Sequence, residues 1–540
     1  MTTAVAGWLD RRPRWQALGL ALLAGALATA ALPPFHAVPL LLLSIPLLIL
    51  LLDRCDTNLS AFWLGWWFGV GHFVTGFFWV ANALAIAGAP PVAAIPLPLG
   101  VAIFMGLTGV LYRVIGKRVD APVLAFALAW MVMEWTRGHF PFGGFPWNLL
   151  GYSWAFSDAM SQFASIGGAY GLSLLTLLVV AAPVHLVARS PEGWSFLRPL
   201  VVPVLILGLM LSYGLWRLPP DDTPAASGPV VRIVQANIPQ ELKWRADLRD
   251  DHFIRYLVMS ELEPDQTVDL LLWPEAAIPY RLDQDIARTV TIGRLMRPGG
   301  YVLTGFPRAE VTPDGYNFFN SMLVIDHVGR EQGLYDKFHL VPFGEYVPLP
   351  AFFAWANKLL NLFGFEDGVA KLVAGGGDFV AGAGPVVMDL PGLPSVSPLI
   401  CYEVIFPGRV TPDDDRPEWL FNLTNDSWYG DLSGPFQHMT IARFRSIEEG
   451  LPMVRAAQTG VSALIDGHGR VLYQLGLGKQ GVIDGVLPPA LQATIYARYG
   501  NLVFWLMITI CGLGALIIGF RQRSDESVAK QTLDRESQAS

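Results

Sequence analysis

Charged residues are scarce in this sequence. Of its 540 residues only 15% are Asp, Glu, Lys or Arg, while 53% are hydrophobic, and the mean hydropathy is +0.42. Soluble proteins are about one quarter charged, so this composition excludes an ordinary soluble protein and indicates a membrane protein. Because Lys and Arg form no basic run, a nucleic-acid-binding surface is not expected either.

Motifs that bind metals and nucleotides are missing as well. The nine histidines are scattered, and no His-x-x-x-His or Cys-x-x-Cys pair occurs, which argues against a metal enzyme. The run Gly375–Gly377 is not followed by Lys-Ser/Thr, so it does not resemble a phosphate-binding loop. We therefore expect no metal and no cofactor.

Long apolar segments occupy most of the chain from Trp15 to Trp216. A membrane-spanning helix needs about 20 mainly apolar residues. By this measure two of the predicted spans, Val38–Leu52 and Ala121–Trp135, are short. We predict eight spans: Trp15–Leu32, Val38–Leu52, Ala61–Leu84, Val92–Ile115, Ala121–Trp135, Gln162–Ala188, Pro199–Trp216 and Leu502–Phe520. The first is expected to be a retained helix rather than a cleaved signal peptide, because six more apolar segments follow closely.

Lys and Arg in short loops predict the orientation of such helices, since both are enriched on the cytoplasmic side. With the N-terminus inside, the outer loops contain only Arg137, whereas the inner loops and flanks contain Arg54, Arg113, Lys117, Arg118, Arg189, Arg198, Arg521 and Arg523. Seven spans then leave residues 229–490 outside, and the eighth returns the chain to the cytoplasm.

The expected domain order follows from these spans. We predict a seven-helix transmembrane domain over residues 1–217, an extracytoplasmic domain over 229–490 and an eighth helix over 500–521. Residues 218–228 contain three Pro, two Asp, one Ser and one Gly, and this content predicts a linker. The polar tail at 522–540 lacks aromatic residues and is expected to be disordered.

Residues 229–490 alternate short β-rich runs with helical stretches, which favours a layered α/β domain. The expected strands are Val230–Gln235, Val268–Trp273, Tyr301–Gly305, Ser321–Ile325, Ser395–Cys401, Trp419–Asn422 and Val461–Asp466, and the expected helices are Arg245–Leu262, Asp283–Leu295 and Gln437–Gly450. Polar residues follow several of these strands, among them Glu275, Cys401 and Asn425-Asp426. Strand ends are where sites collect in α/β sheets.

Only one of the three cysteines, Cys401, lies in this outer domain. A free cysteine is often just a small buried hydrophobe, but a lone thiol in an oxidising compartment is a liability unless it is used. A nucleophilic thiol needs a lowered pKa or a nearby base. Glu275 or Glu403 could take its proton, and Lys337 could stabilise the thiolate.

Glu275 and Lys337 both have apolar neighbours in the sequence. Burial beside Trp273 and Pro274 would raise the pKa of the Glu275 carboxyl toward neutrality, although a solvated turn residue would show the same pattern. Lys337 could face the oxyanion of a tetrahedral intermediate, or it could be a surface lysine with a buried stem. Glu345 could position Lys337 or a substrate amine.

Three motifs, in this order, resemble the Glu-Lys-Cys set of the nitrilase (carbon–nitrogen hydrolase) superfamily: Trp273-Pro274-Glu275, Tyr335-Asp336-Lys337 with Pro342-Phe343-Gly344-Glu345, and Ile400-Cys401-Tyr402-Glu403. The segment Pro452–Gly460 is similar to that superfamily too. Together with the flanking apolar helices, Val234–Gln240, Lys243-Trp244 and Asn422–Gly430 resemble bacterial apolipoprotein N-acyltransferases. The resemblance covers nearly the whole chain except the tail.

This resemblance implies an enzyme of the bacterial inner membrane, with an eight-helix transmembrane bundle and a periplasmic nitrilase-like domain of α-β-β-α layers. It implies a ping-pong reaction in which Glu275 accepts the thiol proton, Cys401 attacks a phospholipid ester, and Lys337 with a backbone N–H holds the oxyanion. The usual donor would be phosphatidylethanolamine, and the acceptor the α-amine of a diacylglyceryl-cysteine at the N-terminus of an apolipoprotein. Glu345 would support the site, Trp244, Tyr402 and Glu403 would line it, and Asn425, Asp426 and Trp428 would form an adjacent loop.

Several alternatives are open. The aromatic-rich stretches Phe140–Trp147 and Phe352–Phe365 could dip into the membrane or simply pack as an interfacial belt. Glu134 and Arg137 are expected to pair with each other rather than to contact a lipid headgroup. Two rival functions are a membrane-tethered amidase or nitrilase with the same triad, and a noncatalytic lipid-binding scaffold. Eight helices exceed what tethering needs, and an intact Glu-Lys-Cys set argues against the scaffold.

Overall fold

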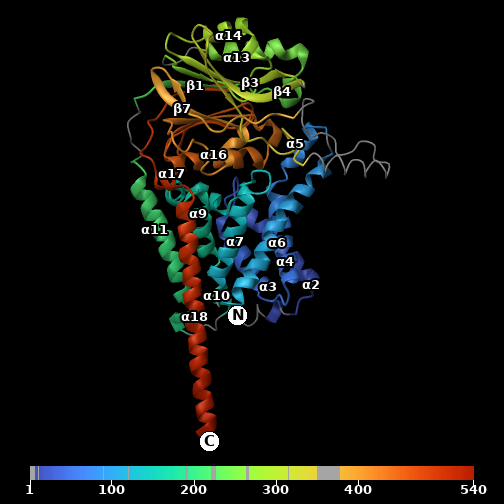
Figure 1. Cartoon of the computed structure of the whole chain (residues 1–540), viewed down its shortest axis with the longest axis vertical. Coiled ribbons are helices and arrows are strands. Elements are labelled where there is room, and N and C mark those ends of the chain that lie inside the picture. Colours follow the sequence, from blue (N-terminus) through green and yellow to red (C-terminus); the bar gives the residue numbers. More distant parts are fainter. Residues whose placement is uncertain are drawn as a thin grey trace, which may run out of the picture. The chain divides into compact units, whose positions relative to one another are not determined.

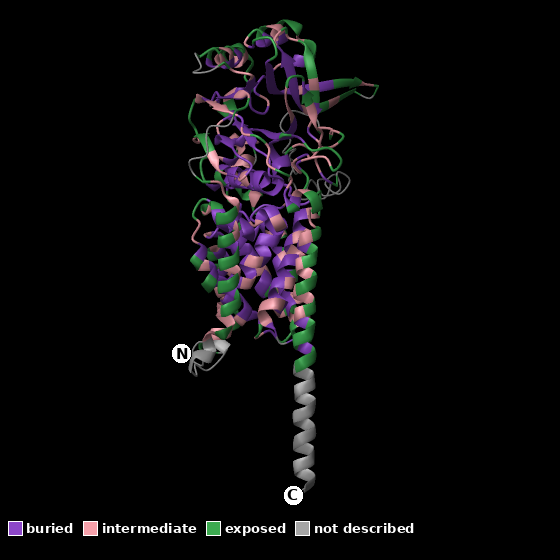
Figure 2. Cartoon of the chain, turned by 90° about the vertical axis from the view of Figure 1, so that its left-hand side faces the viewer, coloured by how far each residue is buried: buried purple, intermediate pink, exposed green. Residues whose placement is uncertain are grey.

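The computed structural model describes residues 7–9, 11–88, 90–119, 121–188, 193–220, 227–262, 267–313, 315–349 and 378–539. The chain divides into two compact units. One, here called the helical unit, comprises Met1–Phe77, Ile95–Arg217 and Tyr499–Ser540. The other, here called the α/β unit, comprises Phe78–Ala94 and Leu218–Arg498. Buried residues fill the interior of each unit (Figure 2).

The helical unit packs apolar helices through small residues. A Cβ atom on Gly25 would lie 1.9 Å from the backbone oxygen of Phe68, and one on Gly71 would lie 2.0 Å from that of Leu22. The two helices that carry these glycines therefore approach each other as closely as small-residue packing of membrane helices allows. The elements are α2 (Arg14–Thr29), η1 (Val38–Leu40), α3 (Leu41–Leu52), α4 (Asn58–Gly76), α6 (Pro96–Gly116), α7 (Pro122–His139), η3 (Leu150–Phe156), α8 (Asp158–Ser161), α9 (Ala164–Val180), α10 (Val184–Ala188), η4 (Gly193–Leu200), α11 (Val201–Arg217) and α18 (Leu502–Ala539).

Within the described residues, four helical segments are long and apolar enough to cross a membrane: Pro91–Gly116, Ala164–Leu186, Leu197–Arg217 and Leu502–Arg521. The pair Asn58–Gly76 and Val80–Ile86 adds a fifth if its two helices form one span, and Val38–Leu52 is a shorter apolar helix. All eight segments predicted as spans overlap helices. Because length and composition single out only four or five of them, the count of eight stays a prediction.

The third predicted span is not one continuous helix. The sequence predicts a span over Ala61–Leu84, whereas α4 ends at Gly76 and α5 (Val80–Ile86) follows with a bend of 56°. Residues from Phe78 to Ala94 belong to the α/β unit. The side chains of Trp79 and Asn82 donate hydrogen bonds there, which gives the physical reason for the break.

Two other expectations concern the C-terminal tail and one aromatic stretch. The sequence predicts disorder for residues 522–540, whereas helix α18 continues through this tail to Ala539. That stretch is rich in Ala, Glu, Lys, Gln and Arg, which are strong helix formers. The stretch Phe352–Phe365 lies outside the described residues.

Arg137 and Glu134 hold the loop that follows α7. Arg137 is buried and donates from Nη1 to the backbone oxygens of Phe145 and Trp147 at 2.6 and 2.7 Å. Glu134 accepts from the backbone N–H of Leu150 at 2.9 Å. Both side chains therefore bind backbone groups of the 145–150 loop.

The α/β unit contains two six-stranded mixed sheets (Figure 1). In each sheet a parallel core is flanked by antiparallel strands: β1, β2 and β3 are parallel in the first, and β7, β8 and β9 in the second. The first sheet has the order β12 (Gly481–Val486), β1 (Val230–Gln235), β2 (Leu270–Leu272), β3 (Tyr301–Thr312), β4 (Gly315–Asp326), β5 (Glu331–Asp336). The second has the order β11 (Val471–Leu475), β10 (Ser462–Ile465), β9 (Met453–Ala457), β8 (Trp419–Thr424), β7 (Leu393–Ile400), β6 (Met388–Leu390).

The two sheets face each other across an apolar core and carry helices outside. Val231, Leu272 and Leu303 of the first sheet pack with Phe421 and Val454 of the second. The opposite face of the first sheet packs against α13 (Arg249–Ser260) and α14 (Ile286–Gly293). Helix α16 (Ser433–Glu449) covers the second sheet (Figure 1). The layered α/β arrangement expected from the alternation of strands and helices is therefore present.

The seven predicted strands and three predicted helices of this unit all coincide with observed elements, apart from shifts at their ends. The sequence pattern missed β5, β6, β9, β11 and β12. Strand β6 has only three residues, and β11 is exposed over most of its length. Such strands lack the apolar run or the clean alternation by which a strand is recognised in a sequence.

Candidate active site

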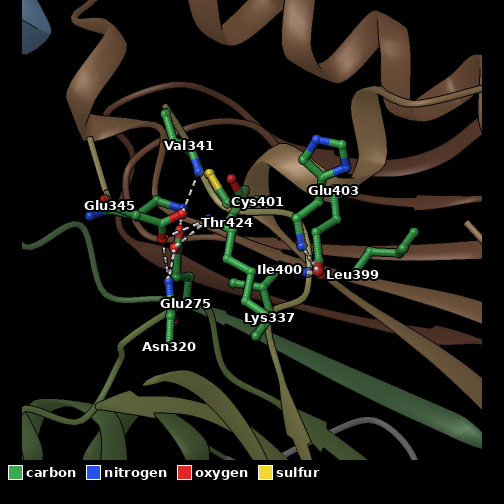
Figure 3. A network of polar contacts seen from close by, with 12 residues as sticks. Glu275, Asn320, Lys337, Val341, Glu345, Leu399, Ile400, Cys401, Glu403 and Thr424 are labelled. Atoms are coloured by element: carbon green, nitrogen blue, oxygen red, sulfur yellow. Dashed lines mark hydrogen bonds and ion pairs between the residues drawn. The ribbon is translucent and has the colours of Figure 1, made fainter. Parts of the chain in front are cut away.

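Glu275 and Cys401, which were expected at strand ends, converge with Lys337 on one place in the α/β unit (Figure 3). Glu275 follows β2, Lys337 follows β5, and Cys401 follows β7. Cys401 begins the 3-10 turn η7 (Cys401–Ile405) with a φ of 52°, a left-handed conformation that few non-glycine residues adopt. Strained residues of this kind cluster at functional sites, and here the strain lies on the predicted nucleophile.

The carboxylate of Glu275 is held at both oxygens. Oε1 accepts from Nδ2 of Asn320 at 2.7 Å, and Oε2 accepts from the backbone N–H of Asn425 at 2.8 Å. Lys243 donates from Nζ to the backbone oxygen of Glu275 at 3.1 Å. These bonds fix a buried carboxylate whose Oε1 lies 3.9 Å from Nζ of Lys337.

Lys337 is buried between carboxylates. Its Nζ donates to Oε1 of Glu345 at 2.8 Å, and Glu345 is itself anchored by the backbone N–H of Val341 at 2.8 Å. Burial opposes the ammonium charge, but the carboxylates of Glu345 and Glu275 outweigh it and raise the pKa of Lys337 above its usual value. Lys337 is therefore a fixed cation beside the predicted base.

Cys401 is buried and un-ionised. Burial and the Glu275 carboxylate raise the pKa of its thiol to about 12, although Lys337 acts in the opposite direction. A thiol with this pKa is almost wholly protonated at neutral pH, so it needs a base at the moment of attack. Among the sticks of Figure 3, Glu275, Lys337 and Glu345 form one polar group near Cys401.

Glu403 is the second carboxylate that the sequence offers as a base. It is fully buried. Its oxygens accept from the Tyr335 hydroxyl at 2.9 Å and from the backbone N–H groups of Phe338, His339 and Ile400 at 2.7, 3.2 and 2.6 Å. Burial raises the pKa of Glu403 to about 7, while the N–H groups that it binds lower it.

These bonds tie together two parts of the site. Ile400 immediately precedes Cys401, and Phe338 immediately follows Lys337, so Glu403 fixes the backbone of both at once. Its hydrogen-bonding capacity is used by the protein's own donors. The geometry therefore favours Glu275 as the base and Glu403 as a positioning residue.

Glu403→Gln is expected to destabilise the α/β unit and to slow modification of Cys401. An amide has one acceptor oxygen instead of two, so the N–H of Phe338 or of Ile400 would face a donor. An unsatisfied buried donor costs about 1–3 kcal/mol. The unfolding midpoint and the rate of Cys401 alkylation measure the two effects.

The matched control is Glu418→Gln. Glu418 is exposed and accepts from one backbone N–H, that of Ser395, at 3.0 Å. The control should keep the wild-type midpoint and alkylation rate. If both variants unfolded at the same temperature, Glu403 would not hold the site as described.

Asp426 anchors a buried network behind Cys401. It accepts from Nη2 of Arg455 at 2.6 Å and lies 2.9 Å from Nδ1 of His438. Burial would raise the pKa of Asp426, but Arg455 and His438 lower it to about 2. The other ring nitrogen of His438, Nε2, lies 3.2 Å from the backbone oxygen of Cys401. The network therefore supports the strained residue from its backbone side.

The three predicted aromatic residues lie at different depths. Tyr402 is buried and packs edge-on against His339, with 5.7 Å between ring centroids. Trp428 is partly buried, and its backbone oxygen accepts from Nδ2 of Asn82 at 3.2 Å. Trp244 is 43% exposed. Tyr402 is thus part of the packed wall, whereas Trp244 offers an accessible ring.

The sequence pattern missed Asn320 and His438. Asn320 lies within β4 and bonds both Glu275 and Glu345, the latter at 3.2 Å. His438 lies within α16. The available signal was only a polar side chain within a strand or a helix, and this signal does not identify the partner.

The arrangement suits acyl transfer by a nucleophilic thiol. It combines a thiol, a fixed carboxylate and a fixed ammonium, which are the parts needed for deprotonation, attack and stabilisation of an oxyanion. Within the part of the chain that the structure describes, no group of three or more His, Cys, Asp or Glu side chains could hold a metal ion.

Comparisons with known proteins match both units. The family model for the apolipoprotein N-acyltransferase N-terminal domain matches residues 24–182, and the carbon–nitrogen hydrolase model matches residues 230–496. The apolipoprotein N-acyltransferase of Rhodopseudomonas palustris is 37% identical over 92% of this chain and 94% of that protein. That of Bradyrhizobium diazoefficiens is 36% identical over 94% and 95%, and that of Caulobacter vibrioides 36% over 97% and 99%.

Proposed function

The chain belongs to the apolipoprotein N-acyltransferase family, and we propose that it transfers an acyl chain from a phospholipid to the N-terminal amine of an apolipoprotein through a thioester on Cys401. It is an N-acyltransferase of lipoprotein maturation with a nitrilase-like catalytic domain. The observation that carries the thioester is the placement of Glu275 and Lys337 beside the buried thiol of Cys401.

In the first half-reaction the proton of Cys401 passes to Glu275 while the sulfur attacks the ester carbonyl carbon. The S–C bond forms, and the carbonyl oxygen becomes an oxyanion that Lys337 and a backbone N–H stabilise. A single donor of this kind contributes about 10²–10³-fold to the rate. When the C–O bond breaks, the oxygen of the lysophospholipid takes the proton from Glu275, and the thioester remains.

In the second half-reaction the α-amine of the N-terminal diacylglyceryl-cysteine attacks the thioester carbon. The N–C bond forms, Glu275 accepts a proton from the amine, and the C–S bond breaks. The sulfur then recovers the proton from Glu275, and the product is an amide. A thiol suits both halves, because it is a good nucleophile and a good leaving group.

The other predicted residues have supporting roles in this scheme. Glu345 positions Lys337, with which it shares a 2.8 Å hydrogen bond, and Glu403 fixes the backbone on both sides of the site. The remaining residues line the site or form the loop beside it: Trp244, Tyr402, Asn425, Asp426 and Trp428.

The finer features of the membrane arrangement belong to the same proposal. We infer eight spans in the bacterial inner membrane, with domain limits at 1–217, 218–228, 229–490 and 500–521 and a tail at 522–540. The asymmetry of Lys and Arg between the loops supports a periplasmic catalytic domain. Phosphatidylethanolamine is the proposed donor because the family resemblance implies it, and a catalytic domain tethered by several apolar helices meets phospholipid at the membrane surface.

A transfer assay separates this function from the amidase alternative. Full-length protein in detergent receives phosphatidylethanolamine with a labelled acyl chain and a synthetic diacylglyceryl-cysteine peptide. We expect labelled amide on the peptide and an equal amount of lysophospholipid. Release of labelled fatty acid without labelled peptide would favour hydrolysis instead, and the absence of any turnover would favour a scaffold.

A further inference from the structure

A short segment distant in the sequence lies against the active site. Trp79 and α5 belong to the α/β unit, although the main part of that unit begins only at Leu218. Trp79 is buried, and its ring meets that of Tyr429 edge-on, with 4.6 Å between centroids and 69° between planes. Its Nε1 donates to Oε1 of Gln437 at 3.2 Å. Trp79 is thus fixed against the turn η8 (Asp426–Tyr429) and the helix α16 that follows it.

Two glycines make room for this segment. A Cβ atom on Gly434 would lie 3.1 Å from Cγ of Trp79 and 2.6 Å from Cβ of Tyr429. Gly430 has a φ of 67°, and a Cβ there would lie 3.1 Å from the side chain of Asn82. The segment is therefore packed at contact distance over both residues, which excludes a loose surface encounter.

The other end of Tyr429 faces the nucleophile. Its hydroxyl oxygen lies 3.9 Å from Sγ of Cys401. Burial, together with the neighbouring Cys401 sulfur and the Asp426 carboxylate, raises the pKa of Tyr429 well above its usual value. The phenol therefore keeps its proton and can donate it in a hydrogen bond to the sulfur.

Other groups also act on this sulfur. The charged and titratable groups around it come from several elements: Glu275, Lys337, Lys243, Asp426 and Tyr429, with the Thr424 hydroxyl as an additional hydrogen-bond partner. Only Lys337 and Lys243 carry positive charge among them. A neutral donor at the sulfur is thus a distinct means of stabilising the thiolate.

We propose that Tyr429 is a further hydrogen-bond donor to the sulfur of Cys401, and that Trp79 is a positioning residue that acts through Tyr429. The proposal rests on the proposed role of Cys401 as acyl carrier. It makes the segment Phe78–Ala94, which begins within the third predicted span, a working part of the catalytic unit. Neither residue belongs to the Glu-Lys-Cys motifs.

Two substitutions test the pair in the full-length protein in detergent. Tyr429→Phe keeps the ring and removes only the hydroxyl, and Trp79→Ala removes the ring that holds it. We measure the rate of Cys401 alkylation by iodoacetamide against pH, by mass spectrometry of the Cys401 peptide, and the single-turnover rate of thioester formation. Both variants should show a higher pH midpoint of alkylation and about tenfold slower thioester formation, the typical effect of one hydrogen bond to a charged group.

The double variant decides whether Trp79 acts through Tyr429. The double variant should form the thioester as slowly as Tyr429→Phe alone, because the effects of residues that work as a unit are not additive. Trp79→Phe keeps a ring against Tyr429 and should recover most of the rate that Trp79→Ala loses, which excludes misfolding as the cause. Val92→Ala is the matched control, because Val92 lies in the same segment and is 63% exposed; it should change neither measurement.

Three results would overturn the proposal: an unchanged pH midpoint and rate in Tyr429→Phe, additive losses in the double variant, or no recovery in Trp79→Phe. Failure of the thioester mechanism itself would be visible separately. In that case the unaltered protein would form no thioester, while the alkylation profile of Cys401 would still report on Tyr429.

Discussion

Lys337→Met is expected to reduce acyl transfer by about 10²–10³-fold, the usual effect of removing one donor to an oxyanion. Methionine fills the space of the lysine stem but has no ammonium group. Loss of the ammonium also leaves the carboxylates of Glu345 and Glu275, whose side chains are 13% and 10% exposed, without the cation that lies 2.8 and 3.9 Å away. Breaking a buried ion pair costs about 3–5 kcal/mol. The kcat/KM for transfer and the unfolding midpoint measure the two effects.

Lys479→Met is the control for this substitution, because Lys479 is exposed and lies in the same unit. It should keep wild-type transfer and stability. An unchanged unfolding midpoint of Lys337→Met would show that the carboxylates do not depend on Lys337. Undiminished transfer would remove Lys337 from the reaction.

Glu275→Gln is expected to lower both the rate of acyl transfer and the pH midpoint of Cys401 alkylation. Acyl transfer should fall by about 10²–10⁴-fold, because a general base contributes that much. The pH midpoint of Cys401 alkylation should fall too, which means that the thiol ionises more readily. The reason is that the Glu275 carboxylate is one of the causes that raise the pKa of Cys401 to about 12. The variant would thus have more thiolate and less turnover.

Glu331→Gln, at the exposed start of β5, controls for the loss of one carboxylate charge in the same unit. It should leave both measurements unchanged. A Glu275→Gln variant with an unchanged or higher alkylation midpoint would show that this carboxylate does not face the thiol. Glu403 would then have to be tested as the base.

The part of the site that follows strands was predictable from the sequence. Glu275 and Cys401 stand after short apolar runs, and such runs end where a buried strand leaves its sheet. Asn320 was not predictable, because it lies within β4 and its partners Glu275 and Glu345 are 45 and 25 residues away. His438 was hidden for the same reason, inside the helix α16.

The break between α4 and α5 shows a limit of hydropathy. A segment that crosses a membrane and one that packs into a protein core are both apolar, so the predicted span Ala61–Leu84 included the residues after Gly76 as well. The two cases are distinguished here by the hydrogen bond from Trp79 to Gln437, a residue 358 positions away in the sequence. Contacts of such long range leave no periodic signal in the sequence.

Detection of the acyl group on Cys401 decides whether the thioester exists. Full-length protein is incubated with phosphatidylethanolamine that carries a labelled acyl chain, without an acceptor peptide, and is then digested and analysed by mass spectrometry. We predict label on the Cys401 peptide that neutral hydroxylamine releases, that moves to the diacylglyceryl-cysteine peptide when this is added, and that Cys401→Ala lacks. Transfer to the acceptor peptide that continues in Cys401→Ala, or without label on Cys401, would contradict the mechanism.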